Sequence, residues 1–180
     1  MVTRTGVTID EFLRMPEEKP ALELIDGEVV QKPMTKRDHW LVADALLAAL
    51  RAYRKRRGGI SGPETTVPFR PGSNALVPDI AYWAPGKPTG TRDESLPPTL
   101  AVEIRSEGQS VEALRSKCLF YVENGVDTVW LIDPATRWVE TFDDMSSGVR
   151  LRSGDRLTSR YLPGFEMDVA ELFAEIDSLG

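Results

Sequence analysis

The spacing of apolar residues predicts two well-defined helices. Over residues 37–56, apolar side chains recur every three or four positions, and the segment ends among four consecutive cations before a pair of glycines, which is typical of a helix C-terminus. Residues 110–124 show the same helical spacing. Shorter helices are predicted at residues 8–15, which begin with a capping-box pattern, and at residues 170–179.

Short apolar runs bounded by turn residues predict the strands. A hairpin is expected over residues 22–30, because Asp26-Gly27 between two apolar runs favours a type I′ turn. Further strands are predicted at residues 65–70, 75–83, 100–105, 128–133, 138–142 and 149–151.

The order of these elements indicates the fold class. Residues 100–133 follow the order strand, helix, strand, and a connection of this length implies a right-handed parallel βαβ crossover. The Pro-rich residues 84–98 have no period and are predicted to form a surface loop on the rim of the functional site. We therefore expect an α/β fold, with a mixed central sheet flanked by helices, in a single domain spanning residues 1–180.

The composition is that of an ordinary globular protein. Of 180 residues, 41% are hydrophobic and 28% are charged, which excludes collagen-like, coiled-coil and disordered classes. No apolar run approaches the ~18 residues of a membrane span, and the first residues lack the apolar region of a signal peptide. The single cysteine, Cys118, fits a reducing compartment and lies on an apolar helix stripe, where a core position is expected. These features predict a soluble cytoplasmic protein without membrane contact.

The balance of charge argues against binding of nucleic acid through the overall field of the protein. The chain carries 22 Lys and Arg against 28 Asp and Glu, a net charge of −6. A local basic run is nevertheless present at Arg54, Lys55, Arg56 and Arg57. These four side chains either complement the dipole at the end of their helix or contact the phosphates of a nucleic acid.

Several common catalytic motifs are absent from the sequence. It has no glycine-rich phosphate loop, no G-x-G-x-x-G after a strand, no G-x-S-x-G and no CxxC pair. The single histidine, His39, excludes a multi-histidine metal site and is either a structural histidine or a base. Any chemistry therefore rests on carboxylates and cations.

Two acids interrupt otherwise apolar strands. Asp79 follows Pro78, and Glu103 shares one strand face with Arg105. A buried carboxylate is costly unless it is paired or bound to a metal. One interpretation is an ion pair of Glu103 with Arg105 or Lys117. The other is that Asp79 and Glu103 lie on neighbouring strands and hold a hard cation, which prefers oxygen ligands.

Lys117 lies on the flank of the apolar stripe of its helix, about 80° from the stripe centre. At this position the ammonium is either solvated or reaches back over the strand end beside Glu103.

These residues belong to a longer series of motifs, and its order extends along nearly the whole chain. The motifs are Pro78-Asp79-Ile80, Ala101-Val102-Glu103-Ile104-Arg105-Ser106, Lys117 with Tyr121, Gly125-Val126, Trp130-Leu131-Ile132-Asp133-Pro134, Glu23-Leu24-Ile25-Asp26-Gly27-Glu28, His39 and Leu162-Pro163-Gly164-Phe165. Together they resemble the bacterial Uma-two family of restriction endonucleases, in the PD-(D/E)XK, restriction-endonuclease-like superfamily. The resemblance implies that fold and a nuclease active site.

The resemblance assigns the oxygen ligands of a metal. Asp79 matches the first metal-binding acid and Glu103 the second, with the carbonyl of Ile104 beside them. Glu23 matches a further acid that faces the site. The implied function is a Mg²⁺-dependent endonuclease, with Mn²⁺ as a substitute, that hydrolyses phosphodiester bonds of DNA by metal-assisted attack of water.

The cations depart from the archetype of the superfamily. The lysine expected two residues after Glu103 is Arg105 here, and Lys117 matches a helix lysine that takes its place. Lys117 would orient or deprotonate the attacking water, or neutralise charge on the phosphate, whereas Arg105 can only hold a phosphate oxygen. Glu107-Gly108 stands where the family usually has Pro-Ser.

Two alternatives to a DNA endonuclease are compatible with the sequence. One is a non-catalytic nucleic-acid-binding or dimerisation module that retains the nuclease fold. The other is a metal-dependent hydrolase of a different phosphate ester. A homodimer is expected for the endonuclease, because two-fold symmetry suits cleavage of both strands of a duplex.

Overall fold

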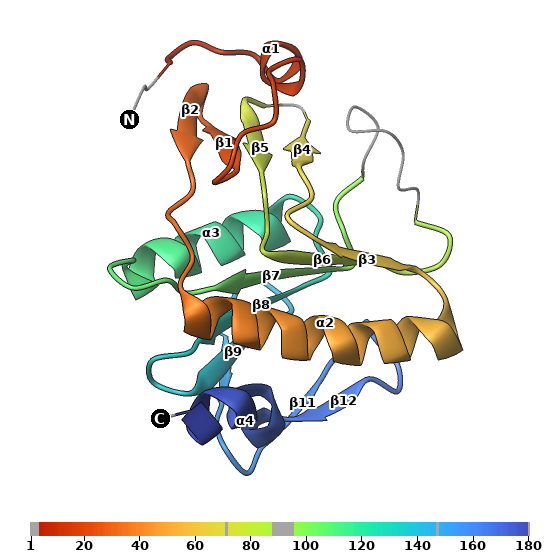
Figure 1. Cartoon of the computed structure of the whole chain (residues 1–180). Coiled ribbons are helices and arrows are strands. Elements are labelled where there is room, and N and C mark those ends of the chain that lie inside the picture. Colours follow the sequence, from red (N-terminus) through yellow and green to blue (C-terminus); the bar gives the residue numbers. More distant parts are fainter. Residues whose placement is uncertain (1–3, 71, 88–95, 147, 180) are drawn as a thin grey trace.

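The computed structural model describes residues 4–70, 72–87, 96–146 and 148–179, which are organised around two sheets (Figure 1). The central sheet has six strands in the order β10-β9-β8-β7-β6-β3. They are β3 (Ile60–Pro63), β6 (Ile80–Trp83), β7 (Leu100–Ile104), β8 (Thr128–Asp133), β9 (Trp138–Phe142) and β10 (Val149–Leu151). The second sheet has four strands, β2 (Glu28–Gln31), β1 (Leu22–Ile25), β5 (Asn74–Leu76) and β4 (Val67–Phe69). A separate ribbon pairs β11 (Arg156–Thr158) with β12 (Glu166–Asp168).

Parallel and antiparallel pairs are combined in the central sheet. β7 and β8 run parallel, and α3 (Val111–Glu123) connects them. The other neighbouring strands of this sheet pair antiparallel within the described residues. The predicted α/β class, mixed central sheet and βαβ crossover are therefore confirmed.

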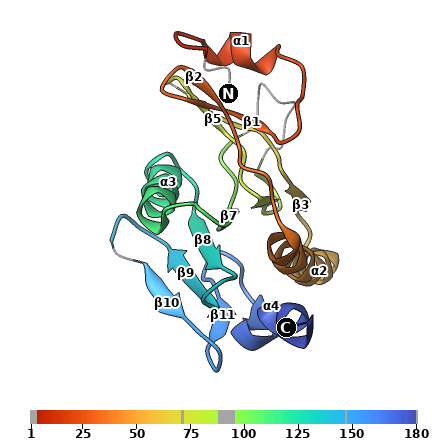
Figure 2. The same ribbon diagram turned by 60° about the vertical axis from the view of Figure 1, so that its left-hand side comes forward.

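Helices cover both faces of the central sheet, as Figure 2 shows. α3 lies on one face, and α2 (Arg37–Arg57) and α4 (Val169–Leu179) lie on the other. Along β7, Val102 and Ile104 pack in the apolar core beneath α2 and α4, whereas Ala101 packs in the core with Cys118 of α3. Because side chains alternate along a strand, Glu103 is directed to the α3 side. The expected core position of Cys118 is confirmed.

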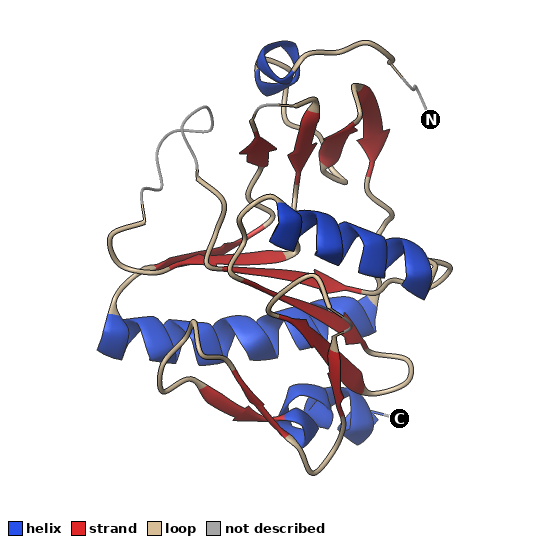
Figure 3. Cartoon of the chain, turned by 180° about the vertical axis from the view of Figure 1, so that it is seen from behind, coloured by secondary structure: helices blue, strands red, loops and turns tan. Residues whose placement is uncertain are grey.

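The four-stranded sheet stands beside α3, and the short α1 (Ile9–Leu13) packs against it (Figure 3). Its β1–β2 hairpin has the predicted turn, with Asp26 and Gly27 at φ of 50° and 81°. This sheet and α3 form the two walls between which the candidate site lies.

One predicted strand is divided between the two sheets. The sequence predicts a single strand over residues 75–83, but β5 pairs within the four-stranded sheet and β6 within the central sheet. Pro78 lies between them and has no N–H to donate to a strand neighbour. The single-strand prediction is wrong because alternation of apolar residues does not specify which sheet a strand joins.

Three further strands, β3, β11 and β12, were not predicted. β3 contains Gly62 and ends at Pro63, and both residue types disfavour strands.

Of the predicted loop over residues 84–98, residues 88–95 lie outside the described residues. The described flanks contact Thr99 and Asp127, close to the start of β7, whereas Glu103 lies near its other end. Among the residues that the structure describes, no helix is long and apolar enough to cross a membrane.

Candidate active site

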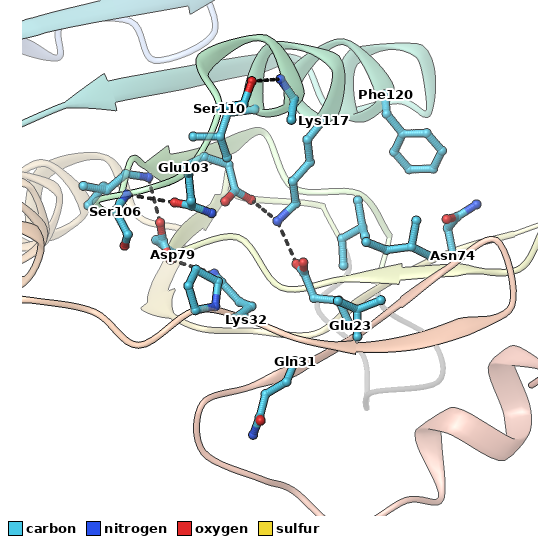
Figure 4. A pocket seen from close by; sticks show the side chains of 18 of the residues that line it. Glu23, Gln31, Lys32, Asn74, Asp79, Glu103, Ser106, Ser110, Lys117 and Phe120 are labelled. Carbon is cyan, nitrogen blue, oxygen red and sulfur yellow. Dashed lines mark hydrogen bonds and ion pairs between the residues drawn. The ribbon is translucent and has the colours of Figure 1, made fainter. Parts of the chain in front are cut away.

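A pocket of about 460 Å³ lies between α3 and the four-stranded sheet, and it contains the predicted acids (Figure 4). β1 supplies Glu23, the segment before β6 supplies Asp79, and β7 supplies Glu103. α3 contributes Lys117 from the opposite wall. Residues from four separate elements therefore meet in one cavity.

Asp79, directly before β6, lies opposite Glu103 of the neighbouring β7. Ile80 of β6 pairs with Val102 of β7, so that Asp79 and Glu103 occupy the next positions in this antiparallel register. Directly opposed residues share a face of the sheet, which brings both carboxylates to the same side. Their residues are only 6% and 3% exposed. The register therefore places the two acids side by side, Asp79 directly before β6 and Glu103 near the end of β7.

Three donors hold the carboxylate of Asp79. The backbone N–H of Ile104 donates to Oδ2 at 2.7 Å, and Nε2 of His39 lies 3.1 Å from the same oxygen. Lys32 Nζ contacts Oδ1 at 2.6 Å and also donates to the carbonyl of Val77 at 2.7 Å. Burial alone would raise the pKa of Asp79, but Lys32 and His39 outweigh it and hold that pKa well below its ordinary value. Asp79 is therefore ionised throughout the neutral pH range.

Glu103 is in a different electrostatic environment. Its Oε1 lies 2.9 Å from Lys117 Nζ and accepts a hydrogen bond from the hydroxyl of Tyr121 at 2.8 Å. Burial dominates over the attraction of Lys117 and Lys32, and the pKa of Glu103 is raised. The two carboxylates are thus shifted in opposite directions, a pattern typical of sites where two acids have different roles.

Lys117 bridges two acids. Its Nζ contacts Glu23 Oε1 at 2.8 Å as well as Glu103, and the same Glu23 oxygen accepts the backbone N–H of Val77 at 2.7 Å. The ion pair of Glu103 with Lys117 is therefore present, and the solvated position considered for Lys117 is wrong. Burial would lower the pKa of Lys117, but Glu103 and Glu23 raise it above the ordinary value. This shift favours Lys117 as a fixed positive charge and opposes the predicted role of deprotonating water.

Arg105 is not brought to this pocket. Its guanidinium pairs with Asp133 Oδ2 at 2.9 Å and donates to the carbonyl of Gln109 at 2.9 Å. It lines an adjacent cavity of about 270 Å³ together with His39 and Glu107. Any contact of Arg105 with a phosphate would therefore occur beside the carboxylate pair rather than within it.

The basic run lies at the far end of α2. His39 contacts Asp79 near the start of this helix, and Arg54 follows 15 residues later, which corresponds to about 22 Å along the axis. Arg54 donates to the carbonyl of Ser61 at 3.3 Å, whereas Lys55 and Arg56 are exposed. The run does not contribute to the pocket.

Sequence reasoning missed the roles of Lys32 and Tyr121 and left that of His39 open. Lys32 follows β2 in a polar segment with no period, and its contact with Asp79 spans 47 positions of the chain. Tyr121 lies on the apolar stripe of α3, where a core role was the natural interpretation. Only the tertiary structure shows that an acid, Glu103, lies next to Tyr121. This contact distinguishes Tyr121 from an ordinary core residue.

The carboxylate oxygens of Asp79 and Glu103 are of the kind that hard cations prefer. Within the described ranges, no three His, Cys, Asp or Glu side chains are grouped as a metal site. The two carboxylates of Asp79 and Glu103 would therefore be completed by the carbonyl of Ile104, by water and by a substrate phosphate, which is how Mg²⁺ is commonly bound. A cation at this position would compete with Lys32 for Oδ1 of Asp79.

A family model described as "Uma2: Putative restriction endonuclease" matches residues 9–170. No curated protein gives a significant match. The crystal structure of a "putative nuclease belonging to DUF820 from Anabaena variabilis ATCC 29413" is similar with a TM-score of 0.82 and 24% identity, over 93% of this chain and 98% of that chain. A cryo-EM structure of a DrdV-DNA complex has a TM-score of 0.39 and 16% identity, over 65% of this chain and 10% of that chain.

The family match extends over most of the chain, and the similarity to the Anabaena variabilis structure shows a shared fold. The chain belongs to the Uma2 family, and its family and fold are those of a restriction-endonuclease-like nuclease.

Proposed function

We propose that the protein is a Mg²⁺-dependent endonuclease that hydrolyses phosphodiester bonds of DNA. The observation that carries this proposal is the opposed pair of buried carboxylates, Asp79 and Glu103, with the fixed cation Lys117 beside them in one pocket. Such a combination serves to hold a divalent cation and to stabilise negative charge on a transferring phosphoryl group.

Each side chain has a distinct part in this proposal. Asp79 and Glu103, with the carbonyl of Ile104, would hold the metal, and Mn²⁺ would substitute for Mg²⁺. Bound metal would supply Lewis-acid activation of the phosphate and of water. Lys117 would stabilise the charge that develops on the phosphate oxygens, and Glu23 would keep its ammonium in place.

A plasmid-nicking assay with Mg²⁺, Mn²⁺ or EDTA tests the proposal. Native protein should nick supercoiled DNA only with a divalent metal. Glu103→Gln should lose at least about 100-fold of the rate, the scale expected when a group acting on the transition state is removed. Glu175→Gln, an exposed change on α4, is the matched control and should retain the native rate. Absence of nicking by native protein under all three conditions would refute the proposal.

A non-catalytic nucleic-acid-binding or dimerisation module is the second candidate. It is favoured by one observation, namely that Lys32 and Lys117 already neutralise the acids within the protein. Calorimetric titration with Mn²⁺ separates the two candidates. A protein that binds DNA but neither binds Mn²⁺ nor nicks DNA would be such a module. Turnover of a small phosphodiester without DNA cleavage would instead indicate a hydrolase of another phosphate ester.

We also propose that the endonuclease acts as a homodimer, because two-fold symmetry allows both strands of a duplex to be cut. Analytical ultracentrifugation with and without DNA tests this. A monomer in both conditions would refute it.

A further inference from the structure

The candidate active-site pocket continues well beyond its carboxylates. In Figure 4, Phe120 and Asn74 lie at the opposite side of the pocket from Asp79, with Lys117 and Glu23 between them. Apolar side chains line this extension, since Ile25 of β1 and Leu76 of β5 belong to the same pocket. The cavity therefore has a charged part and an apolar part, as expected for a ligand that has both characters.

The charged part is deeply placed. Asp79 and Glu103 are 6% and 3% exposed, and the side chains of Lys32 and Lys117 next to them are 9% and 16% exposed. A phosphate that contacts these groups must enter the pocket. In a duplex, the base attached to this phosphate is stacked and paired, so an unpaired nucleotide follows its phosphate into the pocket at a lower cost in free energy.

The apolar part has the properties of a stacking surface. The ring of Phe120 packs edge to face on Phe69, with ring centres 5.3 Å apart and an interplanar angle of 81°. This contact fixes the ring, and Phe120 is only half-buried, so that the ring remains accessible to a ligand. Bases of any sequence stack on aromatic rings because every base has a π-face.

The amide of Asn74, which lies on the same side of the pocket as Phe120, is not free to read a base. Asn74 accepts from the backbone N–H of Asp26 at 3.0 Å, and its amide donates to the Asp26 carboxylate at 3.2 Å. The side-chain amide of Asn74 is therefore occupied by a contact within the protein. Recognition through stacking rather than through hydrogen bonds would give little sequence preference.

We propose that this pocket binds an unpaired nucleotide, with its phosphate at Lys32 and Lys117 beside the carboxylate pair and its base against Phe120. The favoured substrate is then single-stranded DNA, or a nucleotide extruded from a duplex, rather than an intact paired site. This inference rests on the proposed nuclease function and specifies the state of the DNA on which the site acts. The cavity, at about 460 Å³, is within the range of small-molecule sites of roughly 300–1,000 Å³.

The first experiment compares three substrates of one mixed sequence with native protein and Mg²⁺ or Mn²⁺. They are a single strand, its perfect duplex, and a duplex with a central unpaired bubble. We expect the single strand and the bubble to be cleaved at least about tenfold faster than the duplex, because unpairing costs free energy only in the duplex. Binding of the same labelled DNA is measured by fluorescence anisotropy in EDTA and in Ca²⁺, so that the comparison does not depend on cleavage.

Variants at the apolar part provide the second experiment. Phe120→Leu keeps an apolar side chain but removes the ring, and should weaken single-strand binding about tenfold, as expected for loss of one stacked base. Ile25→Trp fills the cavity from the other wall at a position that is 39% exposed, and should have the same effect without disturbing the core. Tyr161→Leu changes a half-buried aromatic residue in the core of the other sheet face and is the control.

The results separate this inference from the proposed function. Equal cleavage of single strand and duplex, or single-strand binding unchanged in both Phe120→Leu and Ile25→Trp, would overturn the inference and leave the nuclease proposal standing. If no DNA is cleaved, the nuclease proposal fails, and the anisotropy measurements alone decide whether the pocket binds an unpaired nucleotide. Losses confined to the two pocket variants, with Tyr161→Leu unchanged, would support it.

Discussion

The ammonium of Lys32 lies 2.6 Å from Oδ1 of Asp79, on a side chain that is only 9% exposed. The same ammonium donates to the carbonyl of Val77. An internal cation therefore occupies one oxygen of the first predicted metal ligand. This arrangement makes the stability of the site depend on Lys32 whenever no divalent cation is bound.

Replacing Lys32 should make the protein more dependent on metal. Lys32→Met leaves the buried Asp79 carboxylate with less compensation, and we expect a loss of about 3 kcal/mol in the free energy of unfolding without metal. Mn²⁺ should raise the melting temperature of this variant more than that of native protein. Lys19→Met removes an exposed lysine that pairs with Glu64, and should change neither quantity appreciably. Equal responses of Lys32→Met and native protein to Mn²⁺ would show that Lys32 does not compete with metal.

Lys117 should be the cation on which turnover depends. Lys117→Met is expected to abolish cleavage, whereas Arg105→Lys should retain it, because Arg105 lies outside the carboxylate pocket. Loss of Lys117 also leaves Glu23 and Glu103 without their common partner and should destabilise the fold by about 3 kcal/mol.

A double substitution distinguishes catalysis from folding at this position. The double variant Glu23→Gln with Lys117→Met removes one acid together with the cation. It should be more stable than Lys117→Met alone but should still fail to cleave DNA. Cleavage rates are compared at a temperature where circular dichroism shows each variant to be folded. Full activity in Lys117→Met with none in Arg105→Lys would identify Arg105 as the essential cation.

The opposite pKa shifts of the two carboxylates predict opposite effects on stability. The pKa of Asp79 is lowered in the folded protein, so its charge stabilises the fold above the ordinary pKa of 3.8, and this contribution is lost as the pH falls below that value. Asp79→Asn should therefore be less stable than native protein at pH 7, with the difference shrinking under acid conditions.

Glu103 should behave in the reverse manner. Burial raises its pKa above the ordinary value of 4.5, so that its ionised form costs stability above the raised pKa and this cost disappears at lower pH. Glu103→Gln should consequently lose less stability at pH 7 than Asp79→Asn, because Lys117 keeps Glu23 as its partner. Denaturant unfolding at pH 7 and pH 3 measures both variants. A larger loss in Glu103→Gln than in Asp79→Asn at pH 7 would contradict the assignment.

The basic run should contribute to DNA affinity without affecting cleavage chemistry. Lys55→Ala with Arg56→Ala removes two exposed cations, and should lower the slope of log affinity against log salt by about 1 to 2 for duplex DNA. The unfolding free energy should be unchanged. A loss of stability with an unaltered salt slope would instead support the role of complementing the helix dipole.

Local patterns were sufficient for most elements of the fold. The predicted helix over residues 37–56 corresponds to α2, and the strand–helix–strand order over residues 100–133 is the observed crossover. Such features depend on neighbours within a few positions of the chain. The division of residues 75–83 between two sheets depends on distant partners instead, which include Leu24 for β5 and Val102 for β6.

The candidate site was predictable to the extent that polar residues interrupt apolar patterns. Asp79 and Glu103 are such interruptions, and the structure places them opposite each other. Lys32 and His39 give no such signal, because each lies in a segment where polar residues are ordinary. Their contacts with Asp79 cross 47 and 40 positions, and only the tertiary fold establishes them.

The crossing of the chain between β5 and β6 places the two parts of the pocket on different sheets. Asp79 and Glu103 rest on the central sheet, whose strands are fixed by cores on both faces, whereas Ile25 and Asn74 belong to the other sheet. Substitutions in the four-stranded sheet can therefore change the shape of the cavity mouth and leave the carboxylate pair in register. Such substitutions would then alter which ligands the pocket accepts while Asp79 and Glu103 keep their relative positions.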